Sequence, residues 1–130
     1  MTEVFGASSS GKTIMCVMAG IETQKRGGLF VFLDYEHAFY MEYAQSLGLD
    51  TDSSKWIYKQ PSSAEEGFKI IDFICNHVRK EGVKIPVTIV LDSVASMVPK
   101  ETYYRDWETD RKSTRLNSSH ITRSRMPSST

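Results

Sequence analysis

The sequence predicts an α/β protein with a parallel sheet flanked by helices. Four short runs rich in β-branched and aromatic residues alternate with stretches of helical pattern, an order typical of parallel sheets with helices packed on both faces. Two of the runs, residues 29–34 and 87–92, are almost continuously apolar, as expected for strands covered on both sides. The chain has 130 residues, of which 40% are hydrophobic. This is enough to bury one core.

The elements follow from these patterns in chain order. We expect strands at residues 2–5, 29–34, 56–59 and 87–92. We expect helices at residues 11–25, 40–47 and 64–80. The first helix stops before Gly27 and Gly28 and the second at Gly48, because glycine commonly follows the last turn of a helix.

The third helix has the clearest start signal and the clearest apolar face. Either Ser62 with Glu65 or Ser63 with Glu66 fits a capping box. Apolar side chains then recur at three-and-four spacing, which predicts one face turned to the core. These residues are Phe68, Ile71, Ile74, Cys75 and Val78.

Charge and cysteine content exclude several classes of protein. Residues 1–109 hold 11 lysines and arginines against 15 acidic residues, so a broad basic face for nucleic acid is not expected. Cys16 and Cys75 lack partners at metal-ligand spacing and predict two reduced, buried thiols. No apolar run approaches the roughly 20 residues that span a bilayer, and the first residues do not resemble a signal peptide. We expect a cytoplasmic protein without a membrane partner.

The end of the chain differs from the rest. Residues 110–130 hold five basic residues against one acidic residue and few apolar ones, so they cannot bury enough surface to offset ordering. The stretch "DRKSTRLNSSH", which begins at Asp110, matches one translated frame of a widely used sequencing-library adapter. We therefore expect residues 1–105 to form the folded part and residues 106–130 to be a non-native, disordered tail.

The stretch "GASSSGKT" fits the phosphate-binding pattern G-x-x-x-x-G-K-[S/T] through Gly6, Gly11, Lys12 and Thr13. Glycines let the loop wrap closely around phosphates, and the following helix directs its free N–H groups and positive dipole end at them. Lys12 would reach the β- and γ-phosphates, and the Thr13 hydroxyl would ligate Mg²⁺. The pattern predicts a P-loop that binds a nucleoside triphosphate with Mg²⁺.

Carboxylates follow two of the expected strands. Asp92 ends the run "VTIVLD", at the sheet edge where ligands of α/β proteins bind, and is expected to hold Mg²⁺ or its water shell. Asp34 and Glu36 in "LDYEH" lie two residues apart, so an extended chain would point both the same way. Either one of them polarises the water that attacks the γ-phosphate, or the segment is a solvated acidic loop.

Three segments together resemble the ATP-binding core of the RecA family, bacterial and phage-encoded. They are "TEVFGASSSGKT", "FLDYEHAFYMEYAQSLGLD" and "IVLDSVASMVPK", and the resemblance covers about residues 2–101. It implies a truncated P-loop NTPase of RecA type. The parent protein would be a DNA-dependent ATPase that forms a homo-oligomeric filament on single-stranded DNA. It would exchange strands with double-stranded DNA in homologous recombination and repair.

The resemblance also implies roles for individual residues. Glu36 matches the family's catalytic base, Asp92 its metal-associated aspartate, Ser93 the neighbour of that aspartate, and Tyr43 the aromatic residue that stacks on adenine. With Lys12, Glu36 forms the expected catalytic pair; Thr13 and Asp92 form the expected metal site. The expected ATP-binding residues are Gly6, Ala7, Ser8, Ser9, Ser10, Gly11, Lys12, Thr13, Tyr43 and Ser93.

Departures from the family leave alternatives open. Tyr40 stands where the family usually has an aspartate that helps to recognise adenine, so strict ATP preference is in doubt. The family's polymerisation helix would precede Met1, and its DNA-binding loops would follow residue 101, so this fragment is expected to be inactive alone. The alternatives are another P-loop enzyme, such as a kinase or helicase-type motor, and a regulatory module that binds nucleotide without hydrolysis. Glu36 discriminates, because a binding-only module does not need it.

Overall fold

The computed structural model describes residues 1–100, and the expected tail at residues 106–130 lies outside the described residues. Its elements match the expected ones closely after the first ten residues. In chain order they are α1 (Lys12–Lys25), β1 (Leu29–Asp34), α2 (Met41–Ser46), β2 (Trp56–Lys59), α3 (Ala64–Lys80), β3 (Val87–Asp92) and the 3₁₀ helix η1 (Val94–Ser96).

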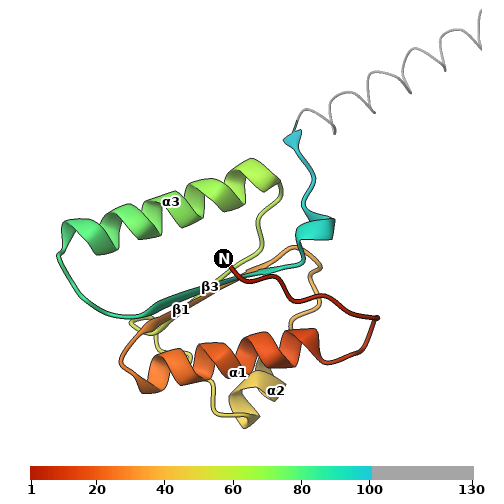
Figure 1. Cartoon of the computed structure of the whole chain (residues 1–130), viewed down its shortest axis with the longest axis horizontal. Coiled ribbons are helices and arrows are strands. Elements are labelled where there is room, and N and C mark those ends of the chain that lie inside the picture. The colour runs from red at the N-terminus through yellow and green to blue at the C-terminus, as the bar shows by residue number, and fades with distance from the viewer. Residues whose placement is uncertain (101–130) are drawn as a thin grey trace, which may run out of the picture. The chain divides into compact units, whose positions relative to one another are not determined.

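The three strands form one parallel sheet in the order β2-β1-β3. The register pairs Asp34 with Asp92, so β1 and β3 end side by side. Helices α1 and α2 lie on one face of the sheet and α3 on the other (Figure 1). The predicted fold class, a parallel sheet flanked by helices, is confirmed, and its carboxyl edge brings together the segments that follow β1 and β3.

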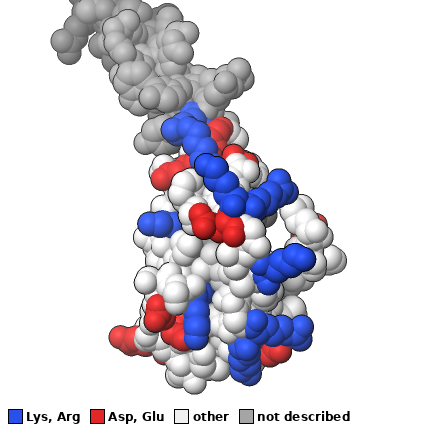
Figure 2. Space-filling view, turned by 90° about the vertical axis from the view of Figure 1, so that its left-hand side faces the viewer, with Lys and Arg blue, Asp and Glu red and all other residues white. Residues whose placement is uncertain are grey.

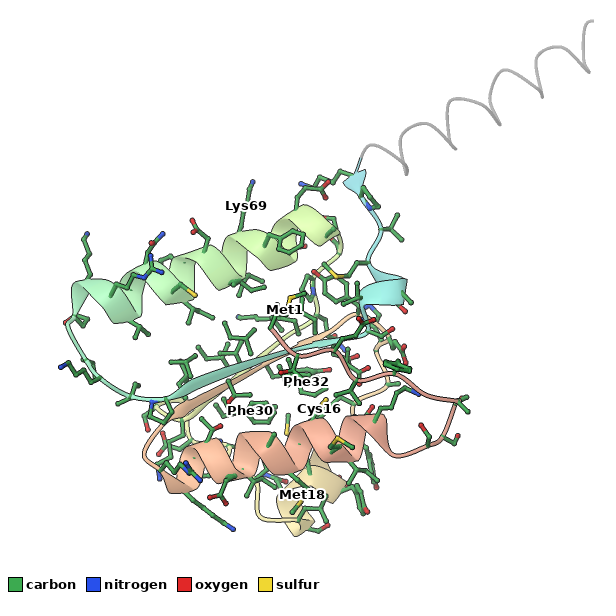
Figure 3. All side chains as sticks on the ribbon, in the orientation of Figure 1. Met1, Cys16, Met18, Phe30, Phe32 and Lys69 are labelled. Carbon is green, nitrogen blue, oxygen red and sulfur yellow. The ribbon has the colours of Figure 1, made fainter. Side chains whose placement is uncertain are left out.

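Strand β1 forms the centre of the core because it is covered on both faces. Phe30 and Phe32 point toward α1 and α2, and they pack with Val17 and Ile21 of α1. Figure 3 shows both rings between the sheet and α1. The alternate residues of β1 pack instead against Ile74 of α3. The continuous apolar sequence of residues 29–33 is therefore explained by two separate clusters, one for each face.

The start of α3 follows the second of the two capping alternatives. The Ser63 hydroxyl accepts a hydrogen bond from the Glu66 backbone N–H at 3.3 Å. The Glu66 carboxylate turns back to Ser62, whose backbone N–H and hydroxyl donate to it at 2.7 and 2.6 Å. This arrangement satisfies donors that a helix start otherwise leaves unpaired, so α3 begins where the sequence predicts.

Two expectations about individual segments are wrong. Residues 2–5 form no strand, and Phe5 is 86% exposed. Only Val4 and Phe5 are apolar in this segment, and both are exposed, so pairing would gain little burial. Phe68 is 58% exposed, because Gly67 occupies the inward position of α3 against the Tyr35 hydroxyl. The buried face of α3 therefore begins with Gly67 and not with the expected Phe68.

The remaining predictions concern the surface charge, the two cysteine thiols and membrane-spanning helices. Cys16 and Cys75 are free, as expected, but half-buried rather than buried. Basic and acidic side chains interleave on the face that Figure 2 shows, without a broad area of one sign. Within residues 1–100, no helix is both long and apolar enough to cross a membrane.

Candidate functional site

The glycine-rich loop of residues 6–13 leads directly into α1. Ser9 and Gly11 take left-handed backbone conformations, with φ of 59° and 84°, and a turn joins the Ser10 N–H to the Ala7 carbonyl at 3.3 Å. Gly11 is the N-cap of α1 and brings no side-chain cap. The first-turn N–H groups of this 14-residue helix are therefore not bonded to a capping side chain, and the positive end of its dipole faces the loop.

Lys12 closes the loop on itself. Its Nζ donates hydrogen bonds to the carbonyl oxygens of Gly6 at 2.9 Å and Ala7 at 2.7 Å. These two bonds place an ammonium charge inside the curve of the backbone. The hydroxyl-bearing residues between them, Ser8, Ser9 and Ser10, are exposed. A positive charge, free helix amides and small side chains thus share one loop, which suits an anion.

Thr13 and Asp92 meet although they lie 79 residues apart in the sequence. The Thr13 hydroxyl donates to Asp92 Oδ2 at 2.7 Å, which joins the first turn of α1 to the end of β3. A hydroxyl and a carboxylate are oxygen ligands of the kind that Mg²⁺ prefers. In the described part of the chain, no three histidine, cysteine or acidic side chains gather as a metal site. A Mg²⁺ ion here would need further oxygen ligands from phosphate and water, as is usual for this ion.

Glu36 contacts Asp92 and its neighbour Ser93, through its backbone N–H and its side chain respectively. The Asp92 carbonyl accepts hydrogen bonds from the N–H groups of Tyr35 at 2.8 Å and Glu36 at 3.3 Å. The Ser93 hydroxyl donates to Glu36 Oε1 at 2.6 Å, and the Asp92–Ser93 peptide bond is cis. The structure therefore brings Thr13, Asp92, Ser93 and Glu36 together through a continuous set of contacts at the carboxyl edge of the sheet.

The expectation that Asp34 and Glu36 point the same way is wrong. Asp34 is 1% exposed, and its carboxylate accepts from the Tyr58 hydroxyl at 2.8 Å and from the Phe39 N–H at 3.1 Å. Glu36 is exposed and turns to Ser93. The chain leaves the extended conformation after Asp34, so the two-residue alternation no longer applies. Of these two carboxylates, Glu36 is the one that contacts Ser93, next to Asp92.

Tyr43 is not brought into contact with these residues. It lies in α2 and is 46% exposed, and within residues 1–100 its side chain makes no hydrogen bond or ring contact with the loop. Tyr40 precedes the same helix, is 64% exposed, and donates to Glu42 Oε2 at 3.0 Å. Both rings are therefore exposed to solvent, Tyr43 in α2 and Tyr40 just before it.

Sequence reasoning missed two features of this region. Tyr58 and Gln60 contribute hydroxyl and amide groups beside Asp34, and their position depends on the strand register, which the sequence does not reveal.

Burial and the nearby Asp92 charge raise the pKa of the Cys16 thiol, which lies on α1 (Figure 3). Cys16 therefore stays protonated and is a weak nucleophile at neutral pH.

The geometry defines an α/β protein with a glycine-rich loop that suits an anion and with a hydrogen-bonded hydroxyl–carboxylate pair, Thr13 and Asp92, at one sheet edge. The profile of the RecA N-terminal domain family matches residues 1–123. The chain belongs to this family.

Individual relatives agree with the profile. The chain is 43% identical over 98 residues to Protein RecA of Rhodopirellula baltica, covering 75% of this chain and 24% of the relative. For Protein RecA of Aquifex pyrophilus the identity is 41% over 102 residues, with 78% and 27% covered. For that of Streptomyces rimosus it is 41% over 100 residues, with 77% and 24% covered. The chain thus spans about a quarter of the length of the curated relatives it matches.

Proposed function

We propose that this chain is the ATP-binding part of a RecA-type recombinase, and that its site is a P-loop that binds MgATP. The Thr13–Asp92 hydrogen bond carries the proposal, because it joins the glycine-rich loop to a carboxylate at the sheet edge. Family membership supports the recombinase class for the parent protein. The parent would act in the cytoplasm on single- and double-stranded DNA as a filament, through regions outside residues 1–100.

Each group at the edge has a defined part in this proposal. The loop amides and the α1 dipole bind the triphosphate, and Lys12 exchanges its two carbonyl partners for phosphate oxygens. Thr13 and Asp92 hold Mg²⁺ directly or through its waters; the ion, when bound, would neutralise charge on the phosphates. Exposed Tyr43 would stack on the base from α2.

Glu36 favours an enzyme over a module that only binds nucleotide. Its carboxylate is exposed, and the Ser93 hydroxyl orients it beside Asp92. It would accept a proton from the water that attacks the γ-phosphate, or orient that water. The same placement also suits a helicase-type motor, and family membership favours the recombinase.

The binding half of the proposal is tested by Lys12→Ala. In the unsubstituted chain, MgATP at 100 times its Kd should stabilise the fold by about 2.7 kcal/mol, measured as a thermal shift. Lys12→Ala removes the loop charge and should abolish that shift. Lys25→Ala, at the other end of α1, is the matched control and should keep the shift, because the one ion pair of Lys25 in the described part of the chain is with Glu22. An undiminished shift in Lys12→Ala would remove the P-loop assignment.

A further inference from the structure

The buried Asp34 carboxylate is the centre of a small polar network behind Glu36. Its Oδ2 accepts from the Phe39 N–H at 3.1 Å and its Oδ1 from the Ala38 N–H at 3.5 Å. The third donor is the Tyr58 hydroxyl of β2, at 2.8 Å from Oδ2. A carboxylate that is 1% exposed needs such donors, since an unpaired buried charge is costly. No salt bridge to Asp34 is found within residues 1–100.

Tyr58 contacts the segment that follows Asp34 through its ring as well as through its hydroxyl. The ring packs on Phe39 with centroids 5.5 Å apart, while the hydroxyl reaches the carboxylate that binds the Phe39 N–H. Gln60 Nε2 donates to the Tyr58 oxygen at 2.9 Å and so fixes the hydroxyl from the solvent side. Burial and the hydrogen bond to Asp34 raise the pKa of Tyr58 to about 12. The phenol therefore remains a donor throughout the neutral range.

Residues 35–39 are thereby anchored at both ends. Their first two N–H groups bond to the Asp92 carbonyl, and the last two bond to the Asp34 carboxylate. Between the anchors, His37 takes a left-handed conformation with φ of 55°, which non-glycine residues adopt at a cost and only when the surroundings hold them. The direction of the Glu36 side chain depends on this backbone, because Glu36 directly precedes His37.

We propose that Tyr58 is a positioning residue for Glu36: its hydroxyl holds the Asp34 carboxylate, which holds residues 35–39 so that Glu36 meets Ser93. This inference rests on the proposed role of Glu36 in hydrolysis. It adds a residue from β2 that touches neither the glycine-rich loop nor the Glu36 carboxylate.

The test is Tyr58→Phe in the 130-residue chain, which removes the hydroxyl and keeps the ring on Phe39. Tyr40→Phe is the matched control, because it removes an exposed phenol whose only hydrogen bond within residues 1–100 is to Glu42. The readout is the ¹³C resonance of the Glu36 carboxyl, and Ser93→Ala supplies the value without the Ser93 hydrogen bond. Tyr58→Phe should move the resonance toward the Ser93→Ala value, and Tyr40→Phe should leave it in place.

Amide exchange supplies a second readout that a general loss of stability would not reproduce. Exchange at Ala38 and Phe39 should rise about fivefold in Tyr58→Phe, the effect of one weakened hydrogen bond. Exchange at Tyr35, which bonds to Asp92, should stay within about twofold. Asp34→Ala removes the acceptor of the same link and should give the same pattern if Tyr58→Phe does not fold. An unchanged Glu36 resonance, or equal acceleration of all amides of β1 and β2, would overturn the inference.

These outcomes are separable from those of the proposed function. If MgATP does not stabilise the unsubstituted chain, the nucleotide site is wrong, whereas the resonance and exchange patterns still decide the link from Tyr58 to Glu36. If MgATP stabilises Tyr58→Phe as well as the unsubstituted chain and Glu36 keeps its resonance, only the positioning role is removed.

Discussion

At the scale of single residues, the carboxylates of "LDYEH" differ because of what surrounds them. Asp34 is enclosed by β1, β2 and its own following backbone, and all its observed partners are donors that hold it in place. Glu36 is exposed and has one hydroxyl partner. A buried, fully bonded carboxylate is held rigidly, whereas an exposed one can exchange its partner for water. Asp34 is therefore suited to structure, and the exposure of Glu36 is compatible with the proton transfer proposed for it.

Glu36→Gln tests that division of roles. In the protein extended to the full length of its RecA relatives, ATP turnover should fall about 100-fold or more, because an amide cannot take the proton of the attacking water. MgATP binding, followed by thermal shift, should be retained. Phosphate release in the presence of single-stranded DNA measures turnover. Glu22→Gln, which among the described residues removes the ion pairs with Lys25 and Arg26 at the end of α1, should turn over normally. Normal turnover in Glu36→Gln would assign the base elsewhere.

At the scale of elements, helix α3 shows that two adjacent positions of one helix can differ completely in burial. Ile74 is 6% exposed and packs against β1, while its neighbour Phe73 is 71% exposed and, within residues 1–100, stacks on no ring but that of His77 in the same helix. The larger apolar side chain therefore contributes less to the core. Burial, and not size, determines what each side chain adds to stability.

This contrast gives a paired prediction. Ile74→Ala should lower the free energy of unfolding by about 2–5 kcal/mol, because it leaves a cavity between α3 and β1. Phe73→Ala should change it by less than about 0.5 kcal/mol, as is usual for exposed positions. Urea denaturation of both variants measures the difference. Equal losses would mean that α3 does not face the sheet as described.

The elements that the sequence predicts correctly have redundant local signals. Strands β1, β2 and β3 have the expected bounds, and α3 has both a capping box and a periodic face. The segment of residues 2–5 has β-favouring residues as its one signal. Because its apolar side chains stay exposed, that preference is not enough to form a strand. In the candidate site, the glycine-rich loop is predictable from its motif, and Asp92 is predictable from its position at the end of a strand. The Asp34–Tyr58 contact depends on the pairing of β1 with β2, which no local pattern encodes.

At the scale of the whole molecule, residues 1–97 form one compact unit. Removal of residues 110–130 should change the free energy of unfolding by less than about 0.5 kcal/mol, because their composition predicts no core contribution. Thermal unfolding of a chain ending at residue 109 measures this. A chain ending at residue 86, which lacks β3, should not fold, because β1 loses a paired neighbour. A marked loss of stability in the first truncation would assign residues 110–130 to the folded part.

The bond between Thr13 and Asp92 also fixes an order of events during translation. The ribosome completes the loop long before it reaches the acid 79 positions later. At roughly 5–20 residues per second, that gap lasts about 4–16 s. Throughout this interval a nascent chain displays the ammonium and hydroxyl of the loop without their acidic counterpart. The polypeptide can therefore join Thr13 to Asp92 only after β3 has emerged.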